Sequence, residues 1–169
     1  SYERTKRWPQ AEADLQKALQ LAPDQPLVLN YLGYSWVDRG MNLEEAFKML
    51  RRAVELRPTD GYIVDSLGWA YYLYGRFEEA RALIERANDL TQDEPNAEVL
   101  DHLGDVYWRL NRRDDARAKW REALDARPDA IRRRSLEQKV SRGLTTSAPR
   151  QRELPQVELP DRPGQREET

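Results

Sequence analysis

Apolar and polar positions along the chain repeat with a period in the mid-thirties. The clearest marker is a leucine–glycine pair, found at Leu32–Gly33, Leu67–Gly68 and Leu103–Gly104, so that the glycines are 35 and 36 residues apart. Around each glycine the apolar residues follow a helical spacing, and a second helical pattern follows further along. A period of this length predicts one pair of antiparallel amphipathic helices in each repeat.

Several further positions recur in register with these glycines. The first helix carries an aromatic residue each time, at Tyr2, Trp36, Tyr71 and Tyr107. The second helix carries two alanines, first at Ala11, Ala46, Ala80 and Ala116, and then at Ala18, Ala53, Ala87 and Ala123. Small residues in register predict that the two helix backbones of each repeat approach closely, because a glycine inside a helix otherwise costs about 0.5 to 1 kcal/mol relative to alanine.

The residues between the paired helices predict how each first helix ends. Gly40, Gly75 and Asn111 occupy these turns. Glycine and asparagine accept the left-handed backbone of a helix C-terminal cap, so we expect this conformation at all three. Prolines close three of the units, at Pro23, Pro58 and Pro128.

This pattern resembles the tetratricopeptide repeat family, whose signature places a tryptophan-like residue, leucine, glycine and tyrosine on the first helix and alanine, a large residue, alanine and proline on the second. Leu29, Val64 and Leu100 stand here in place of the tryptophan-like residue. The resemblance implies an all-α solenoid, a right-handed superhelix whose first helices line a concave face. We expect units at 1–25 (truncated, mostly second helix), 26–60, 61–96 and 97–128, then a capping helix at 129–144 and a disordered proline-rich tail at 145–169. The capping helix has only four large apolar residues, Ile131, Leu136, Val140 and Leu144.

Composition narrows the function without identifying it. Of 169 residues, 39% are apolar and 34% are charged, the net charge is −2, and cysteine is absent. These values exclude disulfides and give no overall positive field for nucleic acid or an anionic membrane. The residue pattern of the repeats resembles that of bacterial, proteobacterial-type envelope proteins. This resemblance favours a periplasmic location, and a cytoplasmic one is the alternative. Because the chain begins at Ser1, we interpret it as the C-terminal repeats of a longer chain.

Candidate catalytic and metal-binding residues are few. His102 is the single histidine, and we expect it to be a partly exposed polar residue between two aspartates. Carboxylates at Asp65, Asp101 and Asp105 could hold a cation, but no ligand-bearing loop accompanies them. The sequence therefore predicts neither a metal site nor a cofactor, and a protein that is not an enzyme.

Two short segments suggest other partners. The basic run 132–134 invites a nucleic-acid interpretation, but a solvated helix face explains it better, because stacking aromatic residues are missing from the segment that follows. The string 160–163 has a PxxP pattern that polyproline-binding domains accept, although such strings are common.

The resemblance also implies where a partner binds, since in this family certain first-helix positions line the ligand groove. Those positions are aromatic and acidic here, and we predict that eight of them contact a protein partner: Tyr34, Asp65, Trp69, Tyr72, Asp101, Asp105, Trp108 and Arg109. Leu27 and Tyr62 occupy equivalent groove positions.

The predicted function is a non-catalytic interaction scaffold that binds a peptide or helix. The partner is expected to be apolar with basic residues, because Asp65 and Asp101 would repel a carboxylate. Two alternatives remain open. One is an adaptor that positions a hydrolase or protease on its substrate. The other is self-association through the apolar side of residues 11–21 to form a homo-oligomer.

Overall fold

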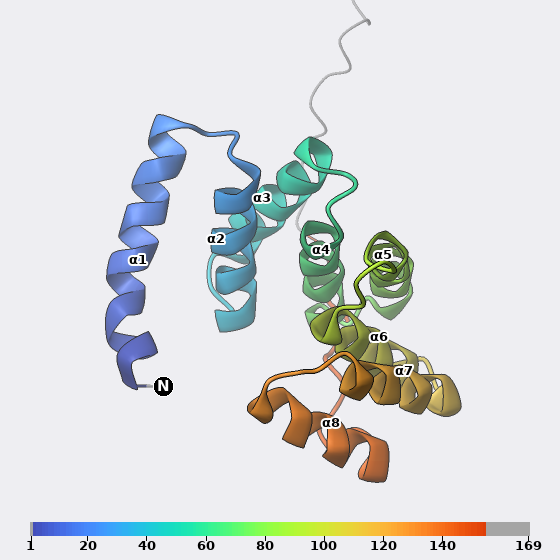
Figure 1. The fold of residues 1–169 in the computed structure, drawn as a ribbon. Helices are drawn as coiled ribbons and strands as arrows, with labels where there is room; N and C mark the ends of the chain where they lie inside the picture. The colour runs from blue at the N-terminus through green and yellow to red at the C-terminus, as the bar shows by residue number, and fades with distance from the viewer. Residues whose placement is uncertain (1, 155–169) are drawn as a thin grey trace, which may run out of the picture.

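The computed structural model describes the backbone of residues 2–154 and the side chains from Pro9 onward. Within this part the chain forms helices and no strand (Figure 1). The helices are α1 (Tyr2–Leu21), α2 (Pro26–Arg39), α3 (Leu43–Leu56), α4 (Gly61–Leu73), α5 (Phe77–Leu90), α6 (Ala97–Arg109), α7 (Arg113–Asp125) and α8 (Ala130–Arg142). The prediction of an all-α repeat fold is confirmed. None of these helices is long and apolar enough to cross a membrane.

Successive helices pair into hairpins, and the hairpins stack (Figure 1). The closest pairs are α2 with α3, α4 with α5, and α6 with α7. The first helices α2, α4 and α6 also contact one another in order, while α1 packs on α2 and α8 packs on α7. We call the side of α2, α4 and α6 that carries Tyr34, Trp69 and Asp105 the inner face.

Glycine on each first helix allows the partner helix to approach, as the sequence predicts. A Cβ atom added at Gly68 would lie 2.5 Å from Cγ1 of Ile84 on α5, and one at Gly104 would overlap the indole of Trp120 on α7. Each hairpin is therefore held at a spacing that a larger first-helix residue would disturb.

The predicted left-handed turns are present. Gly40, Gly75 and Asn111 have φ angles of 66°, 70° and 63°. The N-termini of α4 and α6 are capped by side chains. The Asp60 side chain accepts hydrogen bonds from the backbone amides of Tyr62 and Ile63, and the Asn96 side chain accepts one from the amide of Val99. Such caps satisfy amides that the first helical turn leaves without partners.

Helix α8 joins the main core through Leu136 and the half-buried Val140. Leu136 is fully buried in the cluster that also contains Trp120 and Leu103, whereas Ile131 is exposed. The few apolar residues of this segment thus fit a helix that buries one face against the repeats and exposes the other to solvent.

The segment that follows α8 differs from the expectation of disorder from residue 145. Residues 145–154 lie against the repeats: Arg109 donates to the carbonyl oxygen of Thr146, the amide of Arg152 donates to that of Tyr74, and Leu154 packs on the core formed by α2, α3 and α4. The expectation failed because it counted the few apolar residues of the segment and ignored the hydrogen-bonding groups that the repeats offer. Residues 155–169, the rest of the predicted tail and its PxxP string, lie outside the described residues.

Candidate functional site

One stripe of α4 supplies the centre of the inner face. Tyr62, Asp65, Trp69 and Tyr72 are spaced three or four residues apart, so they lie on the same side of the helix. Their exposure differs: Tyr62 is exposed, Trp69 is half-buried, and Asp65 and Tyr72 are buried. Part of this stripe is therefore accessible to solvent and part is not, depending on which neighbouring helices and loops pack against it.

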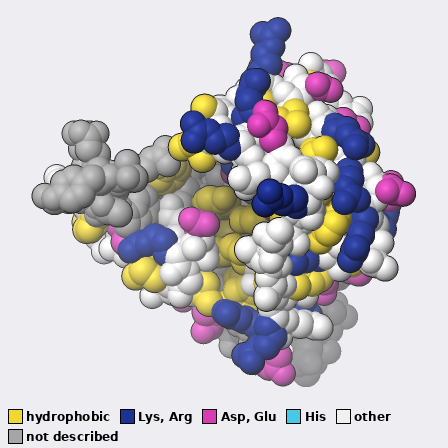
Figure 2. All heavy atoms as spheres, turned by 90° about the horizontal axis from the view of Figure 1, so that it is seen from below, with side chains coloured by type: hydrophobic (Ala, Val, Ile, Leu, Met, Phe, Trp, Pro, Cys, Tyr) yellow, Lys and Arg dark blue, Asp and Glu magenta, His cyan; other side chains and the backbone are white. Residues whose placement is uncertain are grey.

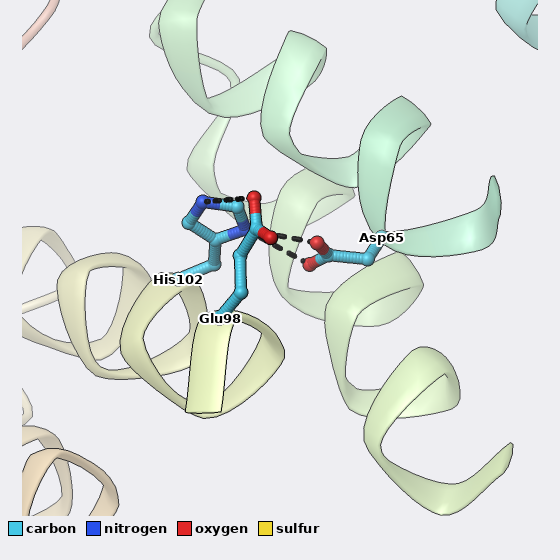
Figure 3. A group of neighbouring side chains, drawn as sticks. All are labelled: Asp65, Glu98 and His102. Atoms are coloured by element: carbon cyan, nitrogen blue, oxygen red, sulfur yellow. Dashed lines mark hydrogen bonds and ion pairs between the residues drawn. The ribbon is translucent and has the colours of Figure 1, made fainter. Parts of the chain in front are cut away.

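His102 of α6 covers Asp65 and is one of the most enclosed polar residues of the inner face (Figure 3). Its Nδ1 atom lies 2.9 Å and 3.1 Å from the two carboxylate oxygens of Asp65. Its ring stacks on Trp69 with centroids 3.9 Å apart and planes 13° apart. The expectation that His102 is partly exposed was wrong, since it is only 5% exposed. The residue joins α6 to α4 and buries the aspartate that was predicted to face a partner.

Burial and charge act in opposite directions on His102. Burial lowers the pKa of His102, but the Asp65 carboxylate, with Glu98 and Asp101 further away, outweighs it and raises the pKa above its ordinary value of 6.5. A protonated imidazole stabilises the buried Asp65 carboxylate by charge as well as by hydrogen bonding.

Among the described residues, one group brings three potential metal-ligand atoms within 4.8 Å of one another: Asp65, Glu98 and His102. In this group the Nδ1 of His102 is already bonded to Asp65, and Arg132 lies 3.9 Å from Glu98. The arrangement is that of an ion-paired histidine, and we do not propose a metal site there.

Two acidic residues of α6, Asp101 and Asp105, are bound by α8. Arg132 and Lys139 each lie 2.7 Å from an oxygen of Asp101, which is only 4% exposed. Lys139 also lies 3.1 Å from Asp105, whose other oxygen accepts from the indole of Trp120 at 3.0 Å. The carboxylates predicted to orient a partner are thus neutralised within the chain.

The ionisation of this cluster reflects its burial. Burial raises the pKa of Asp105, and Asp101 adds to the rise while Lys139 opposes it. For Lys139, burial lowers the pKa, but Asp105 and Asp101 together raise it above its ordinary value. Removing either sign of charge would leave the other buried without a partner.

Three more predicted residues are engaged by other parts of the chain. Tyr72 stacks on Trp69 and accepts a hydrogen bond from Arg109. Arg109 also donates to Thr146 and Ser147. Trp108 packs against Gly143, the C-cap of α8, and the guanidinium groups of Arg113 and Arg117 lie over its ring. None of these three side chains offers its whole surface to an outside partner.

What remains open is the part of the inner face on α2 and α4. Leu27 is 62% and Tyr62 is 54% exposed, and each lies seven residues, two helical turns, before the half-buried Tyr34 and Trp69. Figure 2 shows hydrophobic side chains gathered in a hollow of the surface seen from below. Burial and the nearby carboxylates of Glu98 and Asp38 raise the pKa of Tyr34. We call Leu27, Tyr34, Tyr62 and Trp69 the open patch.

Sequence reasoning missed the partners that cover the α6 end of the inner face. Arg132 and Lys139 are seven residues apart, two turns of α8, and they face aspartates four residues apart on α6. That complementary spacing was a usable signal. It was overlooked because the basic residues were interpreted as a solvated face, an interpretation that fails for Arg132 but fits the exposed Arg133 and Arg134.

Comparison with known proteins agrees with this architecture. Tetratricopeptide repeat family profiles match residues 1–61, 42–100 and 97–130. The bacterial TPR repeat-containing protein PA4667 of Pseudomonas aeruginosa is 38% identical over 96 residues, which are 57% of this chain and only 16% of that protein. The crystal structure of MamA superposes with a TM-score of 0.63 at 25% identity, covering 82% of this chain and 78% of MamA.

A second structure, the first TPR of Spaghetti (RPAP3) bound to the HSP90 peptide SRMEEVD, shares the fold with a TM-score of 0.59 at 18% identity, covering 72% of this chain and 94% of its own. Profiles that together span residues 1–130, a bacterial relative and the stacked hairpins all agree. The chain belongs to the tetratricopeptide repeat family.

Proposed function

We propose that this chain is a non-catalytic protein-interaction scaffold that binds a polypeptide segment on the open patch of α2 and α4. The proposal rests on the exposure of Leu27 and Tyr62, which lie in line with Tyr34 and Trp69, because neighbouring large apolar side chains left in water are typical of a binding surface. Rigid aromatic rings gain contact area at a low entropic cost.

The charge around the patch favours a basic residue in the partner. The carboxylates of Glu98, Asp38 and Asp65 act on the Tyr34 hydroxyl, and Arg132 opposes them. Glu98 and Asp38 keep exposed surface, unlike Asp101 and Asp105. A lysine or arginine placed near Tyr34 would meet these carboxylates, whereas an acidic residue would be repelled.

The way in which α8 binds α6 supports the same chemistry. This helix buries Leu136 in the core and directs Arg132 and Lys139 to inner-face aspartates. A partner with one apolar anchor and nearby basic residues would use on α2 and α4 the kind of contact that α8 makes on α6. The relative with a bound peptide shares only the fold, and the carboxylates here disfavour a peptide as acidic as its SRMEEVD.

Selection from a random peptide library displayed on phage tests the proposal. Peptides are selected on the wild-type chain, and each is then measured on Tyr62→Ala and on Arg121→Ala, a change at an exposed position of α7. The proposal predicts apolar, basic peptides whose binding is weakened by the first change alone. Selected peptides that bind both variants as tightly as wild type would contradict it.

A further inference from the structure

Residues 145–154, which we call the strap, cross the turn-side ends of α6 and α4. At α6, Arg109 donates to the carbonyl oxygens of Thr146 and Ser147 and to the Thr146 hydroxyl. At α4, the amide of Arg152 donates to the carbonyl oxygen of Tyr74 at 2.9 Å. The strap is thus held at two points that lie on different repeats.

The turn between α4 and α5 closely fits the strap. A Cβ atom added at Gly75 would lie 2.5 Å from the amide nitrogen of Gln151 and 2.6 Å from the carbonyl carbon of Arg150. The same atom added at Gly40, the corresponding turn of the preceding hairpin, would meet nothing within 4 Å. Both glycines have left-handed φ angles, so the turn conformation explains glycine at both positions, and the close approach of the strap distinguishes Gly75.

The contacts describe a recognition mode for extended chain. Hydrogen bonds to Arg109 and Tyr74 are made largely by the backbone of the strap, while Leu154 packs on the α2–α4 core and Pro149 lines a cleft beside Trp69 and Tyr72. Backbone pairing supplies affinity and a few apolar side chains supply register, as in other complexes with extended peptides.

We propose that the turn-side ends of α4 and α6 form a binding surface for an extended, proline-containing segment, and that residues 145–154 of the same chain occupy it. The strap also forms one wall of a cleft of about 450 Å³ that includes Trp69 and Tyr72. If the proposed function holds, a ligand that extends from the open patch beyond Trp69 must displace the strap, so the chain carries its own competitor for that end of the groove.

Hydrogen exchange on the full chain tests the docked state without any outside ligand. In the wild type the amide of Arg152, which donates to the carbonyl oxygen of Tyr74, should exchange about tenfold or more slowly than in a synthetic peptide of residues 144–154. Gly75→Asn should remove this protection, whereas Gly40→Asn should keep it, because asparagine is accepted in the left-handed turn at Asn111. An unprotected Arg152 amide in the wild type, or equal protection of it in the two variants, would overturn the proposal.

Binding of a fluorescently labelled copy of the 144–154 peptide, added in trans to the full chain, tests the surface itself. The full-length double variant Arg152→Pro, Leu154→Ser lacks the amide donor and the apolar anchor of the strap, so it should bind the peptide about tenfold or more tightly than wild type. Arg152→Ala keeps the amide and loses only the guanidinium that lies 5.8 Å from the Tyr74 ring centroid, so its binding should stay much closer to that of wild type than to that of the double variant. Equal binding by the double variant and wild type, or none by either, would overturn the inference. These two results would establish the strap-binding surface even if the open patch bound no partner, so the two proposals can fail separately.

Discussion

The ammonium nitrogen of Lys139 lies 2.7 Å from a carboxylate oxygen of Asp101, and this contact fixes α8, the last helix among the described residues, on the inner face of the repeats. Asp101 belongs to α6 and Lys139 to α8, and both side chains are largely shielded from water. A helix that the sequence indicates only as a cap therefore determines how much of the inner face a partner can reach.

Lys139→Met should destabilise the chain by about 3 kcal/mol, because it leaves the Asp101–Asp105 pair buried with one fewer cation. Arg133→Met, at an exposed position of the same helix, should change the free energy of unfolding by less than about 0.5 kcal/mol. Urea unfolding followed by circular dichroism measures both. Equal midpoints for the two variants would show that the buried cluster does not hold α8.

Gly68→Leu should cost about 1 to 3 kcal/mol, because even a Cβ atom at this position would lie 2.5 Å from Cγ1 of Ile84. Ala118→Leu, at an exposed position of α7, adds bulk without crowding and serves as the control. Thermal melts compare them, and a Gly68→Leu melt that matches wild type would contradict the close-packing explanation.

The stability of the chain should depend on pH through His102. Because its folded-state pKa is raised, the imidazolium contributes its full stabilisation below about pH 6.5, the pKa of the unfolded chain, and loses it as pH rises through the folded-state value. His102→Gln should remove this part of the decline. Melting temperatures between pH 6 and pH 9 provide the check, and parallel profiles for the two proteins would argue against a charged His102–Asp65 pair.

The repeat pattern predicted the fold because its key positions act locally. Gly68 and Ile84 determine one hairpin, and Gly40, Gly75 and Asn111 end their helices in the backbone conformation that these residue types favour. Each of these effects depends on residues close together in the sequence or repeated at a fixed period.

The contacts that cover the α6 end of the inner face do not follow from this local repeat pattern. Asp65 pairs with a histidine 37 residues away, and Asp101 with a lysine 38 residues away. Family positions indicate which side chains line the inner face, but they do not indicate that α8 and the strap lie across it. A role of Tyr34 and Trp69 in binding stays a prediction. Leu27 and Tyr62 become stronger candidates for partner contact because their side chains are exposed in the structure.

If a partner binds on the open patch of α2 and α4, the dissociation constant of one library-selected peptide should rise in Tyr62→Ala. Tyr62 is exposed in the free chain, so its loss should leave the melting temperature unchanged and affect the complex alone. Binding to Tyr62→Ala should be weaker by about 2 kcal/mol, roughly thirtyfold in Kd, and binding to Arg121→Ala should match that to wild type. A Kd unaffected by Tyr62→Ala but raised by Arg121→Ala would contradict binding on the open patch.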